Sequence, residues 1–275
     1  MKNDSNLETH NHNISVIAVD LDGTLLRSDG TVSPRTLQVL QRCSEASYRI
    51  VIATGRRPAS VATVLPPELP AEAWVCYNGC QVQVDGLVIH EELLHPQDSR
   101  RIAEWVGARW PQLTIYAEVD GQVFVSKDPG MGFPYQVADI SQIVSRRVVA
   151  MWLGLASVGD AELLQANLPP GCRVVVTGQG EWAAIMPRSA SKAAGLELLL
   201  RTWGLSLYNA IAFGDEMNDL ELVAESGIGV AMGNAVPEIK QVADRVTLTN
   251  DEDGVAVVLE ELLRGGLGWS PFSRA

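Results

Sequence analysis

The strongest constraint on the fold is an alternation of short, β-branched apolar runs with segments of helical periodicity. Residues 14–19, 49–53 and 74–77 form apolar runs without the polar alternation of a half-exposed strand, so we interpret them as buried strands. Ser33 is a natural N-cap between the first two runs, and Pro58 can start a helix before the third. This order is typical of the mostly parallel sheet of a doubly wound, Rossmann-like α/β domain.

The pattern changes at residue 81 and returns after Pro187. Asp85-Gly86 lies between two short strand-like segments and predicts a two-residue hairpin, a connection that parallel strands cannot use. A mixture of strands, helices and a Pro- and Gly-rich loop follows, in α+β style. The sequence therefore predicts a flexible tail at 1–13, an α/β core of residues 14–80 and 188–275, and an inserted α+β domain of residues 81–187.

Composition and charge narrow the classes of function. The 275 residues contain 21 Lys plus Arg against 33 Asp plus Glu, a formal charge of -12 that repels nucleic acids and anionic lipids. No apolar run approaches the ~20 residues that cross a bilayer, and residues 1–13 do not resemble a secretory signal. We expect a cytoplasmic protein with no nucleic-acid or membrane partner. Its oligomeric state is not determined, and a monomer is compatible with the sequence.

Polar side chains follow the predicted strands of the core. Asp20 and Asp22 follow the first strand, Thr54 the second and Asn78 the third, and Asp215 follows the apolar run after the insert. The carboxyl ends of parallel strands lie at one edge of a sheet, where ligands of α/β proteins bind. If the strands before Asp20 and Asp215 are neighbours, ~4.8 Å apart, these carboxylates meet.

A cluster of Asp20, Asp22, Asp215 and Asp219 needs a cation. Two carboxylates ~4 Å apart repel by roughly 4 kcal/mol at an effective dielectric constant of ~20. Magnesium prefers carboxylates together with phosphate oxygens and water, so Mg²⁺ fits this set. The alternative is that these residues only cap helices and turns, which would be preferred for a single Asp. Four Asp at two strand ends, each pair beside a glycine, favour the metal site.

Other groups near these strand ends could hold a phosphate. Thr54 offers a hydroxyl, and the backbone N–H groups of Gly55 and Arg56 precede a predicted helix. Lys192 opens the first helix after the insert, although alone it would be interpreted as a solvated lysine. The tryptophans, Trp152 among them, are interpreted mostly as packing residues of the core or the insert.

The motifs resemble those of the haloacid dehalogenase-like phosphatases. Their order, with the insert between the second and third, is similar to the Cof-type subfamily (IIB), in which a large α+β cap occupies the place of residues 81–187. Beyond its position and size, nothing in the cap carries the resemblance. The four motifs are Asp20-Leu21-Asp22-Gly23-Thr24, Thr54-Gly55-Arg56, Lys192, and Gly214-Asp215-Glu216-Met217-Asn218-Asp219.

The resemblance implies a role for each motif. Asp20 would be the nucleophile that forms an aspartyl-phosphate, and Asp22 the general acid and base. Mg²⁺ would be held by Asp20, Asp215 and the backbone carbonyl of Asp22, and Asp219 would complete the metal site by holding a metal-bound water. The phosphoryl oxygens would be held by side chains from three motifs, namely Thr54, Lys192 and Asn218.

Three functions are compatible with these motifs. The first is a magnesium-dependent phosphatase for small phosphorylated metabolites such as sugar phosphates, with specificity set by the cap. The second is a phosphomutase or phosphotransferase that uses the same aspartyl-phosphate. A non-catalytic phospho-acceptor module is disfavoured, because it would not need Asp22 as a general acid or a hundred-residue insert.

Overall fold

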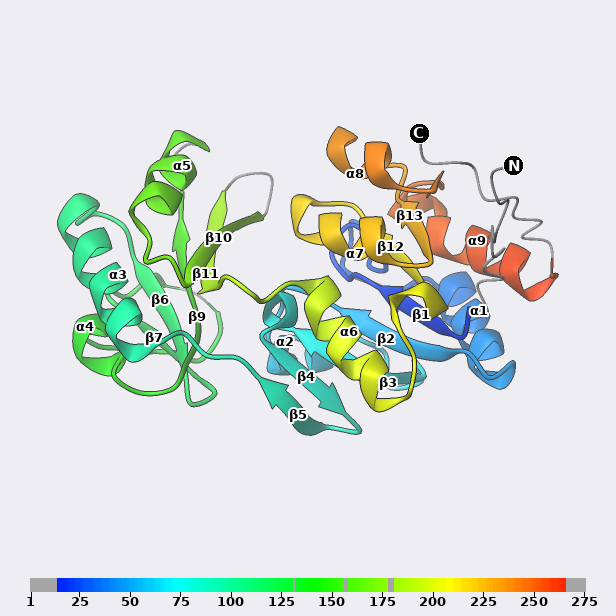
Figure 1. Cartoon of the computed structure of the whole chain (residues 1–275), viewed down its shortest axis with the longest axis horizontal. Helices are drawn as coiled ribbons and strands as arrows, with labels where there is room; N and C mark the ends of the chain where they lie inside the picture. The colour runs from blue at the N-terminus through cyan, green and yellow to red at the C-terminus, as the bar shows by residue number, and fades with distance from the viewer. Residues whose placement is uncertain (1–13, 131, 156–157, 178–180, 266–275) are drawn as a thin grey trace, which may run out of the picture.

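The computed structural model describes residues 14–130, 132–155, 158–177 and 181–265 (Figure 1). The tail predicted at 1–13 lies outside the described residues. Two sheets, one of eight strands and one of six, organise the chain. Within the described ranges, no helix has both the length and the apolar character required to cross a bilayer.

The eight-stranded sheet has the order β14-β13-β12-β1-β2-β3-β4-β5. Its first six strands pair in parallel, as the alternation of strands and helices predicts. The buried runs predicted at 49–53 and near 74–77 are β2 and β3. The strands are β1 (Val16–Val19), β2 (Arg49–Ala53), β3 (Ala71–Cys76), β4 (Gln81–Val84), β5 (Leu87–Glu91), β12 (Ala210–Gly214), β13 (Ile228–Ala231) and β14 (Arg245–Val246).

Helices cover both faces of this sheet, which explains why its central strands are apolar throughout. Ile17 and other odd-numbered side chains of β1 pack with helices α1 and α9, whereas Val16 and Ala18 pack with α6 on the opposite face. Ser33 caps α1 by accepting a hydrogen bond from the Thr36 N–H, as expected. The helices are α1 (Pro34–Glu45), α2 (Pro58–Val64), α6 (Lys192–Thr202), α7 (Leu220–Glu225), α8 (Pro237–Val242) and α9 (Gly254–Leu263).

The hairpin of β4 and β5 occupies a different place from the one we predicted. It forms as expected, with Asp85 and Gly86 at positive φ, but β4 pairs antiparallel with β3 and extends the eight-stranded sheet. The turn determines that two strands form a hairpin and leaves open which sheet edge the hairpin joins. Residue 81 is therefore not where the strands of the second sheet begin.

The six-stranded sheet lies entirely within residues 115–187 and has the order β10-β11-β9-β6-β7-β8. One face packs against helices α3 (Pro96–Arg109), α4 (Ile140–Ile143) and α5 (Val158–Asn167). The opposite face carries Trp152, which packs with Tyr77, the residue that directly follows β3 of the other sheet. The strands are β6 (Ile115–Val119), β7 (Gln122–Val125), β8 (Gln136–Val137), β9 (Val148–Gly154), β10 (Cys172–Thr177) and β11 (Trp182–Pro187).

The register of the central strands places the predicted site. β1 and β12 are parallel neighbours, with Val19 opposite Phe213. Asp20 and Asp215 therefore follow adjacent strand ends although 194 positions of sequence lie between them. The strand adjacency on which the predicted carboxylate cluster depends is confirmed.

Candidate active site

Three buried carboxylates and one buried ammonium meet beyond β1 and β12. Carboxylate oxygens of Asp20, Asp215 and Asp219 lie within 4.8 Å of one another. Lys192 is completely buried, and its Nζ donates to Asp20 Oδ1 and Asp219 Oδ1, each at 2.7 Å. The lysine that would be solvated if taken alone is thus the counter-ion of the cluster, held there by the first turn of α6.

Two glycines make room for this cluster. A Cβ atom on Gly23, whose φ is +76°, would lie 2.2 Å from Asp215 Oδ2, and one on Gly214 would lie 2.4 Å from Asp219 Cβ. Any larger side chain at these positions would displace a carboxylate. Glycine is therefore required at both positions, because the side chains of Asp215 and Asp219 lie too close to the backbone there to leave room for a Cβ atom.

The electrostatics of the cluster show that its negative charge is not fully balanced. Burial raises the pKa of Asp20 well above its ordinary value, against the attraction of Lys192. Burial and the neighbouring charge of Asp219 raise the pKa of Asp215 to about 7. Burial lowers the pKa of Lys192, but the charges of Asp20 and Asp219 outweigh it, so that pKa lies above its usual range. One ammonium does not neutralise three carboxylates.

A hard divalent cation fits this donor set. The groups that could bind a cation here are carboxylate oxygens, which are preferred by hard divalent ions. Together with the single positive charge of Lys192, a divalent cation would balance the three negative charges. Asp215 is oriented by two donors, the Thr24 hydroxyl at 2.9 Å and the Asn234 amide at 3.4 Å. Such fixed carboxylates are typical of metal ligands. Mg²⁺ could therefore be held by Asp20, Asp215 and Asp219.

Asp22 does not join the carboxylate cluster. Its side chain is 57% exposed and forms a two-point ion pair with Arg56, whose Nε and Nη2 donate at 2.7 and 2.6 Å. Ser60 accepts a further bond from the same guanidinium at 3.3 Å. The guanidinium of Arg56 thus fixes the orientation of the Asp22 carboxylate, which lines the cavity.

The remaining predicted residues lie around the same edge of the sheet. Thr54 is fully buried and its Oγ1 accepts from the Arg56 N–H at 3.1 Å. The Asn218 amide donates to Asn78 Oδ1 at 3.0 Å, while its own Oδ1 is buried with no partner in the structure. Gly55 lies against Asn78, because a Cβ on it would be 3.1 Å from Asn78 Oδ1. The buried Asn218 Oδ1 beside the cluster could therefore accept a hydrogen bond from a ligand.

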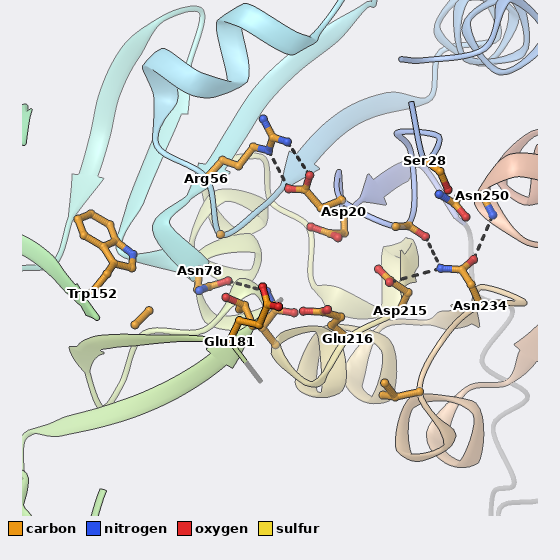
Figure 2. A pocket seen from close by; sticks show the side chains of 17 residues that line it. Asp20, Ser28, Arg56, Asn78, Trp152, Glu181, Asp215, Glu216, Asn234 and Asn250 are labelled. Carbon is orange, nitrogen blue, oxygen red and sulfur yellow. Dashed lines mark hydrogen bonds and ion pairs between the residues drawn. The ribbon is translucent and has the colours of Figure 1, made fainter. Parts of the chain in front are cut away.

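A cavity of about 780 Å³ opens above the cluster, between the two sheets. Asp20, Asp22 and Asp215 line its floor. The six-stranded sheet contributes Trp152, and Glu181 lies directly before its strand β11 (Figure 2). A cavity of this size accommodates a small-molecule ligand.

Sequence reasoning missed four side chains of this cavity: the Arg56 guanidinium, Asn78 as the partner of Asn218, Asn234, and Trp152. Applied to β13, the strand-end rule would have found Asn234, whose amide also donates to the Gly23 carbonyl at 2.7 Å. Trp152, interpreted as packing, also lines the cavity. No local signal marks which face of its strand is turned to the core, because β9 is apolar on both faces.

Comparisons with known proteins identify the family of the chain. The model of the haloacid dehalogenase-like hydrolase family matches residues 17–259. The 5-amino-6-(5-phospho-D-ribitylamino)uracil phosphatase YitU of Bacillus subtilis (strain 168) is 32% identical over 263 residues, which cover 90% of this chain and 96% of that protein.

Solved structures share the fold. BT1666 of Bacteroides thetaiotaomicron, analysed among phosphatases of the haloalkanoate (HAD) superfamily, superposes with a TM-score of 0.80 at 26% identity, over 94% of this chain and 98% of its own. The HAD subclass IIB sugar phosphatase BT4131 has a similar fold, with a TM-score of 0.81 at 20% identity, over 90% of this chain and 98% of its own.

Proposed function

Since the chain belongs to the haloacid dehalogenase-like hydrolases and is a phosphatase, we propose that it hydrolyses small phosphorylated metabolites through an aspartyl-phosphate on Asp20, with Mg²⁺ as cofactor. The observation that carries this proposal is the meeting of Asp20, Asp215, Asp219 and Lys192 at the floor of the cavity. A phosphoryl group placed there would have a nucleophile, a cation site and an ammonium within reach.

In the first step, Asp20 attacks phosphorus with a carboxylate oxygen and the bond from phosphorus to the leaving oxygen breaks. The leaving alkoxide takes a proton from the Asp22 carboxyl, which becomes a carboxylate. Arg56 is placed to receive that carboxylate with its two-point ion pair. Mg²⁺ held by Asp20, the Asp22 carbonyl, Asp215 and Asp219 would supply positive charge against the phosphoryl oxygens.

In the second step, water attacks the aspartyl-phosphate and Asp22 accepts the proton that the water loses. Inorganic phosphate leaves, and both carboxyl groups return to their starting states. The phosphoryl oxygens would be held by Lys192, by Thr54, by the Gly55 N–H and by the Asn218 amide. Asn78 would act through Asn218, because it accepts that residue's amide hydrogen bond.

Residues 14–80 and 188–275 would form the catalytic core, and most of residues 81–187 a cap that closes the cavity and selects the substrate. The hairpin of β4 and β5 would be the exception, because it belongs to the core sheet. The relatives support a phosphatase, while the identity of the substrate would depend on the side chains of the cap.

The test is phosphate release from a panel of phosphorylated sugars, nucleotides and cofactors, with Mg²⁺ and with EDTA. Turnover with Mg²⁺ that is lost with EDTA, and is lost in Asp20→Asn, supports the proposal. Transfer of the phosphoryl group to a sugar hydroxyl without free phosphate would indicate the mutase or transferase alternative instead.

A further inference from the structure

The part of the cavity under the six-stranded sheet differs chemically from the acidic floor. Trp152, Thr177, Glu181 and Ala184 line it from β9, β10, β11 and the residue before β11. In Figure 2, Trp152 stands at the end of the cavity away from Asp215. A substrate whose phosphoryl group lies at Asp20 would therefore direct its leaving group toward these four residues.

The indole of Trp152 is a fixed, half-buried platform. Its ring centroid lies 6.3 Å from that of Tyr77, a buried residue of the core, with the two planes 39° apart. Its cross-strand neighbours are Tyr116 on β6 and Ala184 on β11. The small side chain of Ala184 leaves the cavity side of Trp152 open. A ring held on one side and open on the other stacks on planar ligands at low entropic cost.

Three residues of this lining carry polar groups, namely the indole N–H of Trp152, the Thr177 hydroxyl and the Glu181 carboxylate. The carboxylate can only accept hydrogen bonds, the indole can only donate, and the hydroxyl does both. Convergent polar groups beside an apolar ring surface are the usual composition of a specific ligand site.

The charges of the lining exclude a second anion at this end. Within the described lining, Arg56 is the one cationic side chain, and Asp22 already occupies its guanidinium. Glu181 lines the cavity and would repel a second phosphate or a carboxylate, whereas Glu216 lies nearer to Asp215 (Figure 2). The chemistry favours a neutral ring that carries N–H donors.

We propose that this end of the cavity is a subsite for the leaving group of the substrate, and that it takes a planar, uncharged heterocycle with N–H groups. The ring stacks on Trp152, its N–H groups donate to Glu181, and its carbonyl oxygens accept from Thr177 or the indole N–H. This assignment rests on the proposed phosphatase activity, since the phosphoryl group must lie at Asp20. It narrows the substrate from any phosphorylated metabolite to a phosphate ester of a ring-bearing alcohol.

The experiment compares kcat/KM for matched esters that carry a planar heterocycle (ring-bearing) or lack that heterocycle (ring-free). Cytidine 5′-monophosphate is compared with D-ribose 5-phosphate, and riboflavin 5′-phosphate with D-ribitol 5-phosphate, so that a cyclic and an open-chain linker are both tested. Stacking on an aromatic side chain predicts that at least one ring-bearing ester exceeds its ring-free partner by roughly five- to hundredfold. Trp152→Ala should reduce that ratio to near one, and Trp152→Phe should retain part of it.

Trp105→Ala is the matched control. Trp105 is partly buried on α3 and stacks edge-on against Trp110 on the far face of the six-stranded sheet. Its loss should leave the ratio unchanged. Phosphate release from the ring-free esters with no gain from a ring, or a ratio that survives Trp152→Ala, overturns the subsite while leaving the proposed function intact. No Mg²⁺-dependent release from any ester would instead refute the proposed function.

The charge part of the inference has its own pair of substrates. Orotidine 5′-monophosphate differs from uridine 5′-monophosphate by one carboxylate on the ring, so it should be the poorer substrate by about tenfold or more. Glu181→Gln should narrow that difference. Equal kcat/KM for the two esters, or a difference that Glu181→Gln does not change, would overturn the role of Glu181.

Discussion

Replacing Lys192 by methionine tests the electrostatic description of the site without any substrate. The side chain is completely buried, and its Nζ lies 2.7 Å from an oxygen of Asp20 and 2.7 Å from one of Asp219. At an effective dielectric constant of ~20, each contact corresponds to a Coulomb attraction of roughly 6 kcal/mol. Desolvation of the ammonium offsets much of this, so the net cost of removing one partner of such a buried pair is about 3–5 kcal/mol.

The assay is urea unfolding in EDTA, compared between wild type and Lys192→Met. We expect the free energy of unfolding to fall by about 3–5 kcal/mol, because Asp20 and Asp219 would lose the buried ammonium with which both pair. Lys240→Met is the control, since Lys240 donates to a backbone carbonyl, that of Gly233, and its loss should cost about 1 kcal/mol. A Lys192→Met variant within 1 kcal/mol of wild type would refute the counter-ion role.

Three further outcomes follow from the geometry. Asp22→Asn should lower kcat far more for alkyl phosphates than for p-nitrophenyl phosphate, whose leaving group needs little protonation; equal losses would contradict the general-acid role. Arg56→Lys, which breaks the two-point ion pair, should show the same leaving-group dependence with a loss of about tenfold, and a uniform loss would argue against positioning of Asp22. Burial raises the pKa of Glu118, against the hydrogen bond from Tyr77 and the charge of Arg57, so its stabilising contribution is present at acid pH and is lost as pH rises through the folded pKa. Glu118→Gln should therefore gain stability relative to wild type in thermal unfolding as pH rises above about 4.5, the ordinary pKa of a glutamate carboxyl, and parallel stability curves would contradict this.

The core of the fold and the centre of the site could be predicted because both depend on local patterns. Buried runs such as 49–53 identify parallel strands, and polar residues at strand ends identify the ligand edge. The pairing of β1 with β12 then brings Asp20 and Asp215 together. The strand ends can be identified from neighbouring residues in the sequence, whereas the pairing of β1 with β12 joins distant segments and is established by the structure.

The parts that could not be predicted depend on contacts between distant segments. Asp85-Gly86 specifies a hairpin, but the pairing of that hairpin with the edge of β3 depends on tertiary contacts that the turn sequence does not encode. Trp152 lies in a strand that is apolar on both faces, so its sequence has no alternation to show which side chains point to the cavity. The long, flexible side chain of Arg56 reaches Asp22 only because β1 and β2 are neighbours.

Direct detection of a phosphorylated Asp20 would test the central claim most closely. The Asp22→Asn variant is incubated with p-nitrophenyl phosphate, whose leaving group needs little protonation, so Asp20 should still be phosphorylated. Attack by water should be slow because the general base is missing, and the aspartyl-phosphate should therefore accumulate. After acid quench, peptide mass spectrometry should find one phosphoryl group, with Mg²⁺ present, on the peptide that contains Asp20, and none in the Asp20→Asn, Asp22→Asn double variant. Turnover without any phosphorylated peptide, or a phosphoryl group on another residue, would contradict the account.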